Sequence, residues 1–187
     1  MTPILAIDTS TSRTSVAILD GANTLWSAHH DGASDHGKAL TELVREGIKE
    51  FPEIAKVYVG MGPGPFTGLR VGIAFAQSFA LARAIEVVGV CSLDAVASES
   101  DEYVAATDAR RKEIYWARYK SGKRVEGPFV NFPSDVSAPL FIGEGAFKYG
   151  LSAASQFPDL ALFPLLERVD EPMYLRRPDA VPTVERA

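Results

Sequence analysis

Two aspartates stand at the ends of predicted strands, where carboxylates could hold a metal ion and phosphate. Asp8 follows the apolar run at residues 4–7 and opens an Asp-Thr-Ser-Thr cluster, and Asp108 follows a second predicted strand at residues 103–107. Two such turns, one per lobe of a two-lobed nucleotide-binding fold, would face each other across a cleft. Asp, Ser and Thr also favour turns for local reasons, and the second turn lacks a glycine that would let backbone approach phosphate closely. The pattern alone leaves both interpretations open.

A glycine-rich loop at residues 60–68 lies between a predicted strand and a predicted long helix. Free N–H groups at the start of a helix can cradle phosphate. Pro63 and Pro65 remove two of those donors, and the spacing matches neither the Walker A pattern nor the dinucleotide-binding glycine pattern. The alternative is a rigid turn that fixes how the chain enters the helix.

The histidines and the cysteine give no sign of a metal or nucleophile site. Neighbouring His29 and His30 would point to opposite faces of a strand, and His36 has no second histidine at ligand spacing. Cys91 lies inside an apolar run, where a core position is expected. We therefore predict no metal site and no catalytic residue in this chain.

The charge is distributed unevenly along the chain. The formal net charge is −5, which argues against broad unaided binding to nucleic acid because phosphate attracts a basic surface. Residues 110–124 nevertheless hold seven cations and one carboxylate. This stretch could meet RNA phosphate or an acidic partner, or it could be an ordinary solvated strand pair. The candidate contact residues are Arg110, Arg111, Lys112 and Arg118.

Two predicted helices carry more apolar residues than one sheet face requires. In the helix at residues 67–84, small residues recur every four positions and larger apolar residues line other faces. A helix that is apolar nearly all round is buried on two sides, and its own sheet covers one of them. The second side of this helix packs either against a neighbouring helix of the same chain, at residues 40–48, or against another chain.

The predicted elements form an α/β protein. Three antiparallel strands are followed by helix, strand, helix and strand, which makes a mixed sheet with helices against it. Further strands from residue 103 predict a smaller second lobe, so we divide the chain into residues 1–102 and 103–187. The 187 residues, 47% apolar and 23% charged, have an ordinary globular composition.

The expected location of the chain is cytoplasmic. One cysteine suits a reducing compartment, and no apolar run reaches the length needed to span a bilayer. The residues after Met1 lack the basic start of a signal peptide. We therefore expect no membrane partner.

Five motifs occur together and cover nearly the whole chain, and the second of them is highly specific. They are Ile-Leu-Ala-Ile-Asp-Thr-Ser at residues 4–10, Gly-Pro-Gly-Pro-Phe-Thr-Gly-Leu-Arg at 62–70, Asp-Ala-Arg-Arg-Lys-Glu-Ile-Tyr at 108–115, Gly-Glu-Gly-Ala at 143–146, and Pro-Met-Tyr-Leu-Arg-Arg-Pro-Asp at 172–179. In combination the motifs resemble the TsaB (YeaZ) family, whose members are partner subunits in making threonylcarbamoyladenosine (t6A) in bacterial tRNA.

The resemblance implies an actin/hexokinase/Hsp70-like (ASKHA) α/β fold with two lobes. The second lobe is expected to be trimmed, because residues 146–171 are fewer than family members usually have before the last motif. The implied function is to bind and activate a TsaD-type transferase, which threonylcarbamoylates adenosine 37 of tRNAs reading ANN codons. A TsaE-type ATPase would join that heterodimer, and tRNA would be met through the complex. This chain would require no cofactor, and ATP or ADP with Mg²⁺ would lie at a complex interface.

Carried over by position, the resemblance assigns partner contacts to the two helices and a vestigial nucleotide site to the cleft. Contact between two copies through the same helices would give a homodimer when the partner is absent. The alternative function is a stand-alone kinase or hydrolase that uses both aspartates around Mg-ATP. The predicted interface comprises Leu40, Leu43, Val44, Gly68, Arg70, Gly72, Phe75, Ala76 and Phe79, and the vestigial site comprises Asp8, Ser10, Asp108, Gly143 and Gly145.

Overall fold

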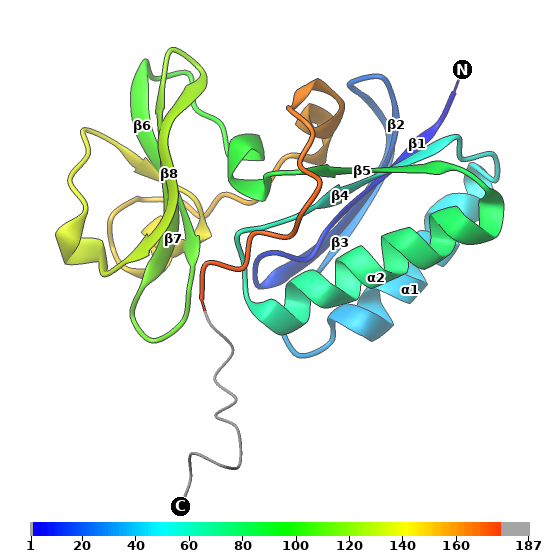
Figure 1. Ribbon diagram of the computed structural model, residues 1–187, viewed down its shortest axis with the longest axis horizontal. Coiled ribbons are helices and arrows are strands. Elements are labelled where there is room, and N and C mark those ends of the chain that lie inside the picture. Colours follow the sequence, from blue (N-terminus) through cyan, green and yellow to red (C-terminus); the bar gives the residue numbers. More distant parts are fainter. Residues whose placement is uncertain (1, 177–187) are drawn as a thin grey trace, which may run out of the picture.

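The first half of the chain forms a five-stranded mixed sheet in the computed structural model, which describes residues 2–176 (Figure 1). The strand order is β3-β2-β1-β4-β5. β2 pairs antiparallel with both β1 and β3, so the predicted meander is confirmed, and β1 pairs parallel with β4. The strands are β1 (Ile4–Asp8), β2 (Arg13–Asp20), β3 (Asn23–Asp31), β4 (Lys56–Gly60) and β5 (Glu86–Val90).

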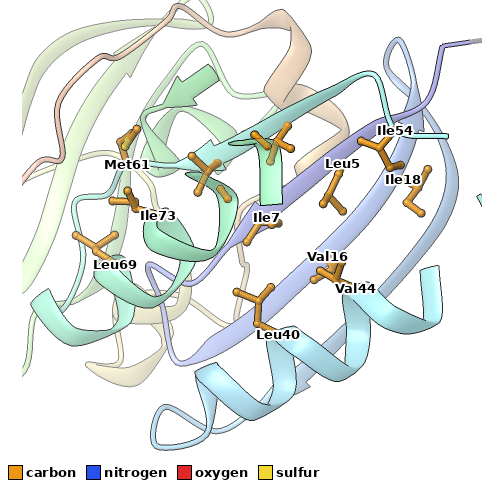
Figure 2. Packing of buried hydrophobic residues seen from close by; sticks show 14 residues of the cluster. Leu5, Ile7, Val16, Ile18, Leu40, Val44, Ile54, Met61, Leu69 and Ile73 are labelled. Atoms are coloured by element: carbon orange, nitrogen blue, oxygen red, sulfur yellow. The ribbon is translucent and has the colours of Figure 1, made fainter. Parts of the chain in front are cut away.

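Two helices, α1 (His36–Glu50) and α2 (Phe66–Arg83), cover one face of this sheet. Alternate residues of the strands point toward them, because side chains on a strand alternate between faces. Figure 2 shows Leu40 and Val44 of α1 directed toward the strands, and both are at most 2% exposed. The main apolar core of the first lobe therefore lies between the sheet and these helices.

The opposite face of the first sheet is covered by a segment from the far end of the chain. The 3-10 helix η3 (Leu160–Leu165) packs there, and its Leu160 and Phe163 join a cluster with Ala17 and Leu19 of β2. Residues 160–165 therefore pack on the first lobe, although the predicted division places them in the second. The reason is apolar burial, since this sheet face would otherwise be open to water.

The second lobe is built on a four-stranded sheet with the order β8-β7-β6-β9. Its strand β6 is antiparallel to β7 and parallel to the short β9. The short helix α3 packs against β6, and the 3-10 helix η1 connects the two sheets. The elements are η1 (Ser92–Ala95), β6 (Glu102–Asp108), β7 (Ile114–Lys120), β8 (Lys123–Asn131), the 3-10 helix η2 (Pro133–Asp135), β9 (Phe141–Ile142) and α3 (Glu144–Lys148).

The described chain ends in an extended stretch, residues 166–176, which we call the C-terminal strap. Val169 donates its N–H to the carbonyl of Gly89 at 2.8 Å, and Met173 donates to the carbonyl of Met61 at 2.8 Å. Val169 also packs against apolar clusters of both lobes. The strap therefore joins the two lobes. The last three residues of the fifth motif, at 177–179, lie outside the described residues.

Candidate functional site

The first aspartate turn is sealed inside the first lobe. Asp8 is 1% exposed, and its carboxylate accepts bonds from the N–H of Ser10 at 2.9 Å and from its hydroxyl at 2.7 Å. The hydroxyl of Ser92 donates to the other carboxylate oxygen at 2.6 Å. Burial raises the pKa of Asp8 although these bonds act in the opposite direction. A side chain at Gly60 would overlap this carboxylate.

The second aspartate turn is more open and is balanced by cations. Lys148 donates to the carboxylate of Asp108 at 2.6 Å, Tyr149 donates at 2.9 Å, and the N–H of Arg110 donates at 3.1 Å. Burial alone would raise the pKa of Asp108, but the bonds from Lys148 and Tyr149 outweigh it and hold the pKa below its ordinary value. Asp108 is therefore a charged, paired carboxylate.

The two predicted glycines of the cleft serve close packing of α3 against β6. Gly143 has a φ of +105°, and a side chain there would overlap the carbonyl of Ala106. A side chain at Gly145 would overlap the backbone of Thr107. Only glycine lets the two segments approach this closely. This approach places the start of α3 between the two lobes.

Glu144, at the start of α3, bridges the lobes and was not among the predicted site residues. Its carboxylate accepts bonds from the N–H of Ser12 at 3.2 and 3.3 Å and from the hydroxyl of Ser12. Burial raises the pKa of Glu144, and the bonds from Ser12 oppose that shift. The contact joins residues far apart in sequence, and the only local signal was an acidic residue at a helix start.

These contacts engage the polar groups of the predicted vestigial nucleotide site within the chain itself. The N–H groups of a turn are donors that can bind phosphate. The N–H of Ser12, in the first turn, donates instead to the carboxylate of Glu144. Asp8 and Asp108 are both engaged by groups of the same chain. Within residues 2–176 no group of three or more His, Cys, Asp or Glu side chains is arranged to hold a metal ion.

The small-residue stripe of α2 packs inside the same chain. Gly68 and Gly72 lie against Thr9 of the β1–β2 turn, whose hydroxyl donates to the carbonyl of Gly68 at 2.8 Å. The sequence left open whether this stripe packs within the chain or against another chain. Its glycines pack within the chain, against Thr9. Five of the nine predicted interface residues are buried in the first lobe: Leu40, Val44, Gly68, Gly72 and Ala76.

The other four predicted interface residues reach the surface of α1 and α2. Leu43, Phe75 and Phe79 are partly buried hydrophobic residues that pack on the edge of the core. The rings of Phe75 and Phe79 are stacked with centroids 6.1 Å apart, and Arg83 lies over Phe79. Arg70 is exposed on the first turns of α2. We call Leu43, Phe75 and Phe79 the α1–α2 ridge.

The predicted basic residues are divided between two places. Arg110, Arg111 and Lys112 lie together in the β6–β7 turn, with φ angles of 62°, 52° and 66°. Arg118 lies on β7 and is paired with Glu126 at 2.9 Å and with Glu102 at 3.6 Å. Arg118 therefore does not belong to the basic surface of the turn.

No helix within residues 2–176 is long and apolar enough to cross a membrane.

Comparison with known sequences gives a family match over residues 30–129, to the model described as "TsaD: tRNA N6-adenosine threonylcarbamoyltransferase". A Mycobacterium leprae protein, ML0378, is 38% identical over 207 residues, which cover 97% of this chain and 57% of that protein. The Escherichia coli tRNA threonylcarbamoyladenosine biosynthesis protein TsaB is 34% identical over 128 residues, or 63% of this chain and 54% of TsaB. The chain thus spans little more than half of either relative.

Two solved structures from Pseudomonas aeruginosa share the fold. One, described as similar to peptidase YeaZ, has a TM-score of 0.76 and 27% identity, covering 94% of this chain and all of that one. The other, YeaZ, has a TM-score of 0.71 and 28% identity, covering 86% and 88%. The predicted actin-like α/β fold, with mixed sheets and flanking helices, is confirmed. With a family match over more than half of its length, the chain belongs to the family that this model describes, and within it to the TsaB (YeaZ) proteins.

Proposed function

We propose that this chain is a partner subunit that binds and activates a TsaD-type transferase. The complex would threonylcarbamoylate adenosine 37 of tRNAs reading ANN codons. Membership of the TsaB family supports a role in t6A formation, since the curated relatives are named for t6A biosynthesis. The finer assignment, to partner binding, is carried by one observation, the α1–α2 ridge.

The ridge has the composition of a contact surface. Phe75 and Phe79 stack on one another beside Arg83. Aromatic and arginine side chains contribute most of the binding energy in protein interfaces. A partly buried aromatic pair loses little conformational entropy when a partner covers it. The ridge therefore supports docking of another folded chain.

The cleft geometry supports an accessory role over the alternative kinase or hydrolase. A kinase of this fold needs carboxylates free to hold Mg²⁺, whereas Asp8 and Asp108 are engaged by Ser92 and Lys148. Our proposal therefore assigns no resident cofactor to this chain. ATP or ADP with Mg²⁺, and a TsaE-type ATPase, belong in this proposal to the assembled complex. Without its partner, the same ridge would pair two copies of the chain.

Light scattering on a sizing column tests the proposal, using the chain alone and mixed with the TsaD-type transferase of the same organism. We expect a new 1:1 peak with the wild type and its loss with Phe75→Asp, because a charge in the ridge would be desolvated on docking. Phe132→Asp is the matched control, since Phe132 is 49% exposed in the second lobe. Thermal unfolding of both variants checks that they fold.

Three outcomes would contradict the proposal. The first is no new peak with the wild type at micromolar concentrations. The second is a complex that survives Phe75→Asp, which would place the interface elsewhere. The third is calorimetric binding of Mg-ATP to the chain alone, lost with Asp108→Asn, which would favour the kinase alternative.

A further inference from the structure

One end of the molecule combines exposed aromatic rings with arginine and lysine side chains. The rings of Phe66, at the start of α2, and Tyr174, in the C-terminal strap, lie 5.0 Å apart between centroids. Phe66 is 42% exposed and Tyr174 is 41% exposed, so both rings are open to solvent. The guanidinium of Arg70 lies 5.2 Å from the Phe66 ring. Two segments far apart in sequence thus build one exposed aromatic pair with a cation beside it.

The same surface continues to the β6–β7 turn of the second lobe. Two residues after Tyr174, Arg176 forms an ion pair with Glu113. The N–H of Glu113 in turn donates to the carbonyl of Arg110 at 2.9 Å, which holds the turn closed below its exposed cations. Figure 1 shows the start of α2, the end of the strap and this turn at one end of the molecule, the lower end in that view. We call Phe66, Arg70, Arg110, Lys112, Tyr174 and Arg176 the basic–aromatic rim.

The charge of this end differs from that of the whole chain. Around the rim, Arg111 and Lys148 add to the four cations named above, which makes six, while the nearby carboxylates are Asp108, Glu113 and Glu144. The chain as a whole carries a net charge of −5. The opposite end of β6 mixes three acids, Glu99, Asp101 and Glu102, with lysines of the β7–β8 hairpin. Positive charge is therefore concentrated at the rim, where it can attract phosphate.

We propose that the basic–aromatic rim binds RNA through phosphate contacts and the stacking of unpaired bases. Cations alone would suit any polyanion, but an exposed aromatic pair flanked by arginine is the arrangement on which unstacked bases lie. The inference rests on the proposed function, because that function supplies an RNA substrate to the complex. It goes beyond it by giving this chain a direct contact with the RNA.

Fluorescence anisotropy tests the proposal with a labelled RNA hairpin whose single-stranded loop has about seven nucleotides. We expect the full chain to bind the hairpin at about 50 mM salt and to release it as salt rises. Tyr174→Ala should weaken binding by about fivefold or more, and Tyr174→Phe should retain it because the ring remains. Lys112→Glu should weaken binding by about tenfold and flatten the salt dependence.

Controls separate this surface from general charge effects. Lys123→Glu makes the same charge change in the exposed β7–β8 hairpin, at the other end of β7, and should alter affinity by less than about twofold. A blunt RNA duplex of equal length should bind more weakly, because its bases are stacked. Three results would overturn the proposal. They are equal losses of affinity in Lys112→Glu and Lys123→Glu, duplex binding as tight as hairpin binding, and competition by polyglutamate as effective as that by unlabelled hairpin. So would the absence of wild-type binding at about 100 µM.

The result is separable from the test of partner binding. Tyr174→Ala and Lys112→Glu leave the α1–α2 ridge intact, so both variants should still form the 1:1 complex with the transferase. Loss of that complex in the rim variants would make the rim a protein contact and overturn the RNA assignment. RNA binding by a chain that forms no complex would instead contradict the proposed function and leave the rim assignment standing.

Discussion

Each lobe ends a central strand with an aspartate, yet the two residues sit in opposite electrostatic settings. Asp8, at the end of β1, is buried, and its partners are the neutral groups of Ser10 and Ser92. Asp108, at the end of β6, is paired with the ammonium of Lys148. The pKa of Asp8 is raised and the pKa of Asp108 is lowered. Burial shifts the pKa of one aspartate upward and pairing shifts that of the other downward, although both are the same residue type at the end of a central strand.

The difference shows what each turn contributes. The first turn fixes the contact between β1 and α2, because Thr9 packs against the glycines of that helix. The second turn borders solvent and carries the exposed cations of the basic–aromatic rim. One aspartate thus stabilises the interior of a lobe, while the other orders a surface that remains available for binding.

The largest expected effect comes from removing the glycines that make room for each turn. Gly60→Ala would press on Asp8, and Gly145→Ala would press on the backbone of Thr107, so each should cost about 3 kcal/mol. Urea denaturation measures the loss. Gly37→Ala on α1 is the control, since nothing lies within 4 Å and the helix should gain stability. A loss below about 1 kcal/mol at either site would show that the turn can relax.

Removing one hydroxyl donor from each aspartate should separate the two settings. Ser92→Ala leaves a buried carboxylate oxygen without its partner and should cost about 2 kcal/mol. Tyr149→Phe removes the corresponding bond to Asp108, but Lys148 and solvent remain, so about 0.5 kcal/mol is expected. Equal losses in urea denaturation would mean that burial does not distinguish the two turns.

The two aspartates should also respond to pH in opposite directions. The raised pKa of Asp8 gives stability that is present below its ordinary value of 3.8 and is lost as pH rises through the folded-state pKa. The lowered pKa of Asp108 gives stability that is present above 3.8 and is lost as pH falls through the folded-state pKa.

Asparagine substitutions test these signs. Asp108→Asn should cost about 1 kcal/mol near pH 7, because Lys148 loses its charged partner. Asp8→Asn should gain stability relative to the wild type as pH rises from about 4, since the buried charge can no longer form. Urea denaturation across this range measures both variants. If the free energies of unfolding of the wild type and of Asp8→Asn changed in parallel with pH, the burial argument would be contradicted.

An equally small effect is expected for Lys148 of α3, whose ammonium pairs with Asp108 and has no counterpart at Asp8. The Lys148 side chain is 49% exposed, so its ion pair with Asp108 is screened by water. Lys148→Gln should cost about 0.5 kcal/mol at low salt and less at high salt. A larger cost that salt leaves unchanged would show that Lys148 acts through packing rather than through charge.

Local patterns in the sequence predicted the positions of the main elements. The apolar run before Asp8 is β1, and the helix predicted over residues 67–84 is α2 at Phe66–Arg83. Strand β8 runs from Lys123 to Asn131 through Gly127 and Pro128, two residues that weaken a local strand pattern. The strand lies at the sheet edge, where a proline is tolerated.

The features that the sequence did not predict depend on long-range contact. Nothing near Glu144 indicates Ser12 as its partner, and nothing near Val169 indicates the carbonyl of Gly89. The sequence showed the small-residue stripe of α2 but not which segment packs against it, because glycine admits any close neighbour. The structure fills that space with Thr9. Local patterns gave the candidate carboxylates, and tertiary packing decided which groups of the chain pair with them.

The C-terminal strap has a consequence for the order in which the molecule can be completed during translation. The strands of the first sheet leave the ribosome early, whereas the residues that bond to Gly89 and Met61 are Val169 and Met173. Until those residues emerge, two carbonyls of the first lobe lack their strap partners. Contacts between residues so distant in sequence also form slowly. The joining of the lobes through the strap is therefore a late step of folding, which follows the pairing of the strands of the first sheet.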